Sequence, residues 1–411
     1  MESRVDEILT TLKRIKDRLE NLEVDVKEIK KQTLGKNSAS QPDGLQKGDV
    51  QATSRPEQRK LLSRPSGDDS ELGKMLRSIE HHHLSAELSE NEKTKPALVQ
   101  FVGEKFILPS LEICRSGVSY MGSTYEFTAL PGKSDFDIQF FVKLPISKHN
   151  GKKVGDAEVL ESDDAAWKFV KGGPVDLLDE AGYLSAEKTR KLVLSTVDKA
   201  LKMSSVRLEF KGDTVEITRS TSGPAITLNV KWRGETVSID IVVCLKAADM
   251  KNSKFDLVAK PYAKSSTTLA NRYWRLSYSS HELKLLREFH SKHPRKNTLL
   301  RIMKLIKQHH SQLRIFPSYF YKNILFLMVK KDPFADWDTK ADLAPRFKDM
   351  IVLIQGVLQS QQLPLHFNSD VNYLADMDKT KIEGVANFLK RIISKEKYCD
   401  LFKGLPAMSE E

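Results

Sequence analysis

Residues 134–141 read Ser-Asp-Phe-Asp-Ile-Gln-Phe-Phe, and the pair Gly122-Ser123 precedes them across a turn at Pro131-Gly132. Side chains two residues apart in a strand point to the same face, so Asp135 and Asp137 are predicted to project side by side. Two close carboxylates repel each other unless a cation neutralises them, and Mg²⁺ binds carboxylates together with water and substrate phosphates. The glycine lets backbone N–H groups approach a phosphate, and the serine adds a hydroxyl donor. The stretch therefore predicts either a metal and phosphate site or a solvated strand face.

A third carboxylate lies further along the chain. Residues 236–245 hold one acidic residue, Asp240, among β-branched apolar residues, which predicts a buried strand. A lone aspartate there is costly to bury without a partner. If Asp240 lies beside Asp135 and Asp137, the three carboxylates complete a two-metal site for phosphoryl transfer. Gly-Ser, Asp-x-Asp and a later strand aspartate together resemble the polymerase-β-like nucleotidyltransferases.

Five further blocks flank the third acid in a fixed order. They are 222–228, Trp274-Arg275-Leu276-Ser277-Tyr278-Ser279, 301–305, Pro317-Ser318-Tyr319-Phe320-Tyr321-Lys322 and Asp336-Trp337-Asp338. In this order and spacing the chain resembles the cyclic GMP-AMP synthase (cGAS) family, and most closely its animal cGAS-like receptors, over residues 72 to 411.

The resemblance implies a role for individual residues. Gly122 and Ser123 fall on contacts to the donor triphosphate, and the metal ligands Asp135, Asp137 and Asp240 also become the catalytic residues. Positions that line the nucleotide pocket fall on Arg275, Ser277, Ser279 and Glu282. Phosphate contacts fall on Lys304 and Ser318, and Tyr319 matches an aromatic residue that stacks on a base. Tyr319 as a core tyrosine and Lys304 as a surface lysine are the alternatives. The implied cofactor is Mg²⁺ or Mn²⁺, and the implied substrates are ATP, GTP or both.

Residues 1–31 carry an unbroken heptad pattern. Apolar residues alternate three and four apart, at Val5, Ile8, Leu12, Ile15, Leu19, Leu22, Val26 and Ile29. This spacing predicts a coiled coil that makes a homo-oligomer, with an amphipathic helix packed on the body as the alternative. Residues 32–71 are rich in Gly, Pro and Ser and poor in large apolar residues, which predicts a flexible linker.

Positive charge is unevenly distributed. The chain carries a formal net charge of +11, and residues 284–314 alone hold nine Lys or Arg against one acid, Glu288. Such density near a catalytic site indicates a polyanion surface, although the same charges suit nucleoside triphosphates or a solvated helix. Lys292, Arg295 and Lys296, expected in a loop around Pro294, are the predicted nucleic-acid contacts.

The positions of the cysteines help to predict which ligand activates the protein. Vertebrate members of the family carry a His-Cys-Cys-Cys zinc thumb after the Trp-Arg-Leu-Ser block, whereas the corresponding interval here has histidines and no cysteine. We therefore expect no structural zinc, and double-stranded RNA rather than DNA as the activator. Cys114, Cys244 and Cys399 lie far apart, which fits a reducing compartment. With no secretory signal or membrane span recognised, the expected location is cytoplasmic.

The sequence thus predicts an α/β body in two parts, in addition to the N-terminal coiled coil. Residues 72–280 are expected to form a nucleotidyltransferase core with a mixed β-sheet, and 281–411 a C-terminal helical lobe. The resemblance implies an enzyme that joins two NTPs into a cyclic dinucleotide second messenger of innate immunity. A linear-product enzyme resembling oligoadenylate synthetase, or a non-catalytic scaffold, remains the alternative.

Overall fold

The computed structural model describes residues 71–85, 89–111, 117–132, 135–142, 147–149, 152–154, 158–161, 167–203, 208–220, 226–245, 255–260, 271–333, 337 and 343–405. All of them belong to one compact unit, Ser66–Glu411. The predicted coiled coil at 1–31 and all but the last residue of the predicted linker lie outside the described residues, so both stay predictions.

Two parallel strands, β2 (Phe136–Val142) and β10 (Glu235–Leu245), form the middle of the sheet. β10 pairs antiparallel with β9 (Ile226–Trp232) over its first half and with β11 (Asp256–Val258) at its end. Within the described residues the sheet has ten strands, in the order β5-β6-β12-β11-β10-β9-β8-β7 with β2 and β1 attached through β10. The others are β1 (Val118–Met121), β5 (Glu158–Glu161), β6 (Trp167–Lys171), β7 (Leu208–Phe210), β8 (Asp213–Arg219) and β12 (Tyr273–Ser277); β3 (Ser147–His149) and β4 (Lys152–Val154) pair separately.

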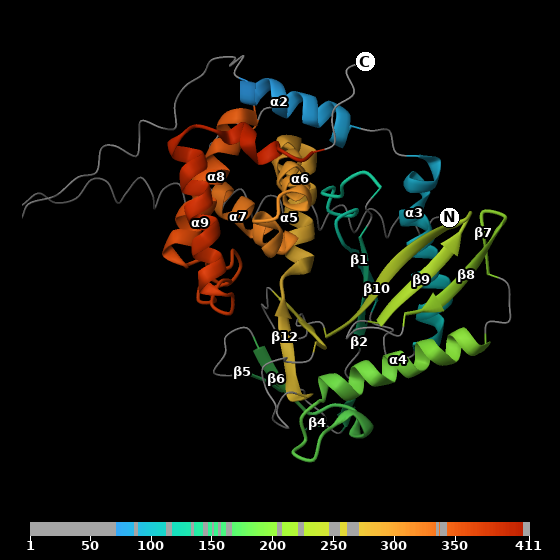
Figure 1. Cartoon of the computed structure of the whole chain (residues 1–411). Coiled ribbons are helices and arrows are strands. Elements are labelled where there is room, and N and C mark those ends of the chain that lie inside the picture. Colours follow the sequence, from blue (N-terminus) through green and yellow to red (C-terminus); the bar gives the residue numbers. More distant parts are fainter. Residues whose placement is uncertain are drawn as a thin grey trace, which may run out of the picture. The chain divides into compact units, whose positions relative to one another are not determined.

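One face of the sheet is covered by helices. Alternate residues of β2 and β10, among them Phe136, Ile138 and Ile239, pack in a core with α3 (Glu90–Phe101) and α4 (Ala186–Met203). Figure 1 shows α4 running along the sheet near β8 and β9. Because strand side chains alternate between faces, the intervening residues of β2 and β10 point to the opposite face. That opposite face carries the polar residues described below.

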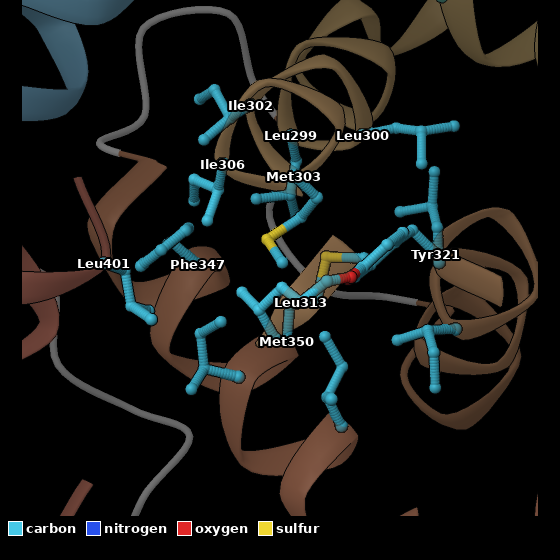
Figure 2. Packing of buried hydrophobic residues seen from close by; sticks show 14 of the residues in the cluster. Leu299, Leu300, Ile302, Met303, Ile306, Leu313, Tyr321, Phe347, Met350 and Leu401 are labelled. Atoms are coloured by element: carbon cyan, nitrogen blue, oxygen red, sulfur yellow. The ribbon is translucent and has the colours of Figure 1, made fainter. Parts of the chain in front are cut away.

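The C-terminal part is a helical lobe with its own hydrophobic core. It contains α5 (Ser279–Lys292), α6 (Pro294–His309), α7 (Ser318–Lys331), α8 (Leu343–Ser360) and α9 (Lys379–Ser394), and α2 (Glu71–Ile79) packs on it. Figure 2 shows apolar side chains of α6 and α8 meeting there, among them Leu299, Met303 and Met350. Short 3₁₀ and π turns complete the described helices: Glu80–Leu84, Val102–Ile107, Leu108–Ser110, Val175–Leu177, Leu313–Ile315 and Tyr398–Phe402.

The predicted mixed α/β architecture with a helical C-terminal part is confirmed. The described helices include none that is long and apolar enough to cross a bilayer.

Candidate active site

The parallel pairing of β2 with β10 brings two of the predicted carboxylates together. Asp137 and Asp240 are register partners, and Asp135 immediately precedes β2. On the neighbouring antiparallel strand, Thr227 is the register partner of Asp240 and donates its Oγ1 hydrogen to Asp240 Oδ1 at 2.6 Å. We call Asp135, Asp137 and Asp240 the acid cluster. Residues more than a hundred positions apart in the chain are thus neighbours on one sheet face.

The acid cluster carries unbalanced negative charge. Burial raises the pKa of Asp137 to about 7, with further contributions from the nearby carboxylates of Asp135 and Asp240. Burial also raises the pKa of Asp135, and Asp240 adds to this effect while Lys304 opposes it. A raised carboxyl pKa means that the charged form lacks a favourable partner. A cation bound beside these residues would supply one.

An all-oxygen donor set fits Mg²⁺ or Mn²⁺ rather than a softer metal. In the part of the chain that the structure describes, however, no three His, Cys, Asp or Glu side chains stand arranged as a metal cage. The acid cluster therefore has the chemistry of a divalent-metal site, and its side chains would have to rearrange to ligate an ion together. Metal binding by Asp135, Asp137 and Asp240 stays a prediction.

The Gly-Ser turn packs directly against the start of β2. Gly122 has φ +98°, and a Cβ at this position would lie 2.2 Å from the carbonyl oxygen of Asp135. Only glycine meets both conditions. Ser123 is 9% exposed, and its carbonyl accepts the backbone N–H of Thr128 at 2.9 Å. The predicted phosphate-contact residues thus lie beside the first acid.

The helical lobe holds this turn by its carbonyl groups. The five successive carbonyls of residues 125–129 accept hydrogen bonds from Arg287 of α5 and from Asn297, Arg301 and Lys304 of α6, at distances from 2.9 to 3.5 Å. We call this set of contacts the carbonyl ladder. Because Asn297, Arg301 and Lys304 are four and three positions apart, they share one face of α6.

One residue inside the ladder is strained. Phe127 has φ +57°, a left-handed conformation that is unfavourable for a side chain of its size. Its ring stacks on His290 of α5, with centroids 3.9 Å apart, and Asn297 donates to its carbonyl. The contacts with the helical lobe therefore fix a turn conformation that its own sequence does not favour.

A buried ion network lies next to the turn. Lys322 of α7 contacts Glu126 at 2.6 Å and Glu282 of α5 at 3.3 Å. Burial alone would lower the pKa of Lys322, but the two carboxylates outweigh burial and raise it. Glu282 also accepts the hydroxyl of Tyr319 at 2.9 Å. Glu282, predicted to line the nucleotide pocket, is 4% exposed and instead supports Tyr319 and Lys322.

The other predicted pocket residues are more accessible. Arg275 is exposed, whereas Ser277, Ser279, Ser318 and Tyr319 are partly buried. Tyr319 lies 5.6 Å from Tyr373, centroid to centroid, which places a second aromatic ring beside the predicted stacking residue.

Lys304 is buried in this conformation. It is 9% exposed, and its Nζ donates to the carbonyl and hydroxyl of Thr128 at 3.0 and 2.9 Å. Burial lowers its pKa to about 8, although the nearby carboxylates of Glu126 and Asp135 oppose this effect. Its predicted phosphate contact would require an exchange of partners, as would that of Ser318, which accepts from Lys307 Nζ at 3.4 Å.

The expected loop around Pro294 is wrong. α5 ends at Lys292 and α6 begins at Pro294, so the junction between the helices is short. Proline suits the first helical position because it has no N–H to leave unpaired there.

Two of the three predicted nucleic-acid contacts are engaged inside the protein. Lys296 is 5% exposed, and its Nζ lies over the ring of Phe289 at 4.5 Å, so its assignment to a nucleic-acid surface is corrected. Arg295 forms an ion pair with Glu80. Lys292 is the exposed member, and it pairs with Glu288 at 2.9 Å.

Several residues of this region were missed by the sequence reasoning. Gln139, Thr227 and Lys322 lie inside the quoted blocks but received no role, and Glu126 and Asn297 lie outside them. Period-two alternation already places Gln139 on the face of Asp137. No local signal marks Thr227 or Asn297, because their partners are distant in sequence.

Two protein-family models match this chain. The profile of the Mab-21 protein nucleotidyltransferase domain matches residues 132–288, and that of the Mab-21 protein HhH/H2TH-like domain matches residues 295–391. The two matches together span more than half of the chain.

Individual relatives are distant. The cyclic GMP-AMP synthase-like receptor of Ctenocephalides felis is 26% identical over 301 residues, which cover 62% of this chain and 67% of the relative. The receptor of the same name from Aethina tumida is 22% identical, covering 67% and 74%. Cyclic GMP-AMP synthase of Mus musculus is 24% identical, covering 74% and 65%. The chain belongs to the Mab-21/cGAS-like family of proteins with a nucleotidyltransferase domain and a helical C-terminal domain.

Proposed function

We propose that the protein is a metal-dependent nucleotidyltransferase that makes a cyclic dinucleotide from two NTPs. A ribose hydroxyl of one NTP attacks the α-phosphorus of the other, and the bond to pyrophosphate breaks. In a second transfer the roles are reversed. A ribose hydroxyl of the other nucleotide attacks the remaining α-phosphorus, pyrophosphate leaves again, and the ring closes. The observation that carries the proposal is the register of Asp137 with Asp240, beside Asp135 and the Gly-Ser turn.

The residues of the chain have distinct parts in this proposal. Asp135, Asp137 and Asp240 would hold Mg²⁺ or Mn²⁺. The metal would neutralise the negative phosphates and stabilise the negative charge that develops on the attacking hydroxyl oxygen. Gly122 and Ser123 bind the donor triphosphate, and Lys304 and Ser318 reach it after exchanging partners. Arg275, Ser277, Ser279 and Tyr319 contact the bases and sugars, while Glu282 holds Tyr319 in place.

We extend the proposal to activation by double-stranded RNA in innate immune signalling. The support is the basic segment 284–314, in which Lys284, Arg287 and Lys292 are exposed, together with the relatives named as cGAS-like receptors. Duplex RNA suits a surface that reads backbone shape and charge.

The test is a product analysis with the full chain. It is incubated with ATP, GTP, CTP and UTP and Mg²⁺ or Mn²⁺, with and without duplex RNA or DNA, and products are identified by mass spectrometry. We expect a cyclic dinucleotide from the wild type and none from the double variant Asp135→Asn, Asp137→Asn. Near-normal turnover by the double variant would overturn the metal-site assignment. A linear product would establish the alternative enzyme class, and no product under any condition would indicate a scaffold.

A further inference from the structure

Gln139 is a buried polar residue to which the proposed function gives no role. It follows Asp137 by two positions on β2, so both side chains lie on the same face of the sheet. It is 4% exposed, and its Nε2 donates to Ser279 Oγ at 2.7 Å. Its other amide atom, Oε1, is buried without a hydrogen-bond partner.

The orientation of this amide follows from the cost of each choice. The O and N atoms of a glutamine are assigned from their partners. With Nε2 toward Ser279, one of its two N–H groups is paired and the oxygen is left without a partner. In the reversed orientation, both N–H groups of Nε2 would occupy that unpaired position. Buried unpaired N–H groups are rarer than under-satisfied carbonyl oxygens, so Gln139 donates and Ser279 accepts.

This donation decides what the neighbouring serines present to a ligand. Ser277 ends β12, Ser279 begins α5, and their Oγ atoms lie 2.8 Å apart. The pair has two hydroxyl hydrogens, and one of them is used between the two oxygens. Because Gln139 supplies a hydrogen rather than taking one, the second hydroxyl hydrogen stays available. Both serines are partly exposed, so a ligand can reach this hydrogen.

Distance along the strand indicates which part of a nucleotide meets this hydrogen. Asp137 and Gln139 are separated by two residues, or about 7 Å along β2. A ribose spans a comparable length between the phosphate and the base. A nucleotide with its phosphates at the acid cluster therefore brings its base near Ser277 and Ser279.

We propose that Gln139 is a positioning residue that makes the Ser277–Ser279 pair a hydrogen-bond donor, which selects a nucleotide whose base offers an acceptor atom there. This inference rests on the proposed function, because it requires nucleotide binding at the acid cluster.

The test measures nucleotide affinity and base preference rather than product formation. Full-length wild type and Gln139→Met, which keeps the side-chain volume and removes the amide, are titrated calorimetrically with ATP, GTP, CTP and UTP in Mg²⁺. We expect the preferred NTP to bind the variant almost as tightly as the wild type, because the hydroxyl hydrogen of the serine pair remains. An NTP whose base presents a donor at this point should bind the variant about 3- to 10-fold more tightly than the wild type, because Ser279 Oγ becomes free to accept one neutral hydrogen bond. The preference among the four bases should narrow by the same factor. Discrimination between the preferred NTP and its 2′-deoxy form should not change. Gln355→Met on α8, where Gln355 donates to Gln359, is the matched control and should bind like the wild type.

A double-mutant cycle separates positioning from general structural damage. If Gln139 acts through Ser279, then Gln139→Met in a Ser279→Ala background should change affinity by less than about twofold, because coupled residues are non-additive. Should Gln139→Met fail to fold, Ser279→Ala alone must narrow the base preference. Unchanged preference in these variants, or additive effects in the cycle, overturns the inference while wild-type binding stands. Failure of the wild type to bind any of the four NTPs overturns the proposed function and the inference with it.

Discussion

The acid cluster and the cations of the helical lobe are both concentrations of charge, but their partners differ. Asp135 and Asp137 have raised pKa values, and among the described residues neither forms an ion pair with a lysine or arginine. Lys296, Arg301 and Lys322, in contrast, have a ring face, backbone carbonyls and carboxylates of the same chain as partners. Charge without an internal partner indicates a ligand site, whereas matched charge indicates a structural role.

The largest expected effect is on stability, from removing a matched cation. Lys322→Met leaves Glu126 and Glu282 buried without their shared partner. We expect the free energy of unfolding to fall by about 3–5 kcal/mol, as when one member of a buried ion pair is removed. Denaturant unfolding of both proteins measures this.

Lys331→Met is the control for Lys322→Met, because Lys331 is an exposed lysine of the same helix. A loss no greater than that of the control would mean that the network contributes nothing, and the contrast between matched and unmatched charge would lose its main support.

The next effect concerns the carbonyl ladder. Asn297→Ala removes the donor to the carbonyls of residues 126 and 127 and relieves the restraint on strained Phe127. We expect a loss of about 1–3 kcal/mol, the cost of leaving buried polar groups unpaired. Thermal unfolding measures it, with Asn387→Ala on the exposed face of α9 as control. Equal melting temperatures for the two variants would show that the ladder is not held by Asn297.

The third effect has the opposite sign and tests the unmatched charge. A carboxyl whose folded pKa is raised destabilises the protein when ionised, so wild-type stability should decline as pH rises from about 4, the unfolded pKa, to about 7, the folded pKa of Asp137. Asp137→Asn removes this charge. Asp137→Asn should therefore be more stable than the wild type at pH 8 by about 1–2 kcal/mol without divalent metal, with the advantage shrinking below pH 7 and vanishing below about pH 4.

Metal addition sharpens the same comparison. Mg²⁺ or Mn²⁺ should raise the melting temperature of the wild type more at pH 8 than at pH 6, because protons compete for Asp137 at the lower pH. Asp137→Asn should respond much less. A pH-independent metal effect of equal size in both proteins would place the ion elsewhere.

The smallest effect concerns Lys292, an exposed lysine of the basic segment. Lys292→Glu should weaken duplex RNA binding and reduce the magnitude of the salt slope by about one unit or less, since one phosphate contact is lost. Stability should hardly change, because the pair with Glu288 is exposed. Lys403→Glu, at an exposed lysine that pairs with Asp400, is the control. Identical binding isotherms and slopes for the two variants would remove Lys292 from the nucleic-acid surface.

Local pattern was sufficient for some of these features. Alternation along residues 134–141 placed Asp135 and Asp137 on one face, and the apolar surroundings of Asp240 predicted its strand. The helical C-terminal part was predicted as well. These inferences depend on neighbours in sequence, where period and composition carry the information.

Long-range pairing was beyond the same reasoning. The register of Asp137 with Asp240 depends on how β10 aligns with β2. The alternation within each strand does not fix this alignment, because a shift by two residues keeps the same side chains on the same face. Lys292, Arg295 and Lys296 have similar sequence surroundings, yet the first is exposed and the third is buried. A sequence gives the charge of a residue but not its partner, and here the partner decides between a surface contact and a core contact.

The carbonyl ladder also limits how the chain can be divided. Residues 125–129 belong to the sheet part by sequence, but their backbone acceptors are paired with side chains from α5 and α6. A fragment that ended at residue 280 would keep every carboxylate of the acid cluster and lose every one of these donors. The Gly-Ser turn would then keep only its own backbone hydrogen bonds, such as that from the N–H of Thr128 to the carbonyl of Ser123, and its packing against Asp135. The proposed activity therefore requires the two lobes as one folding unit, and we expect the sheet alone to be inactive.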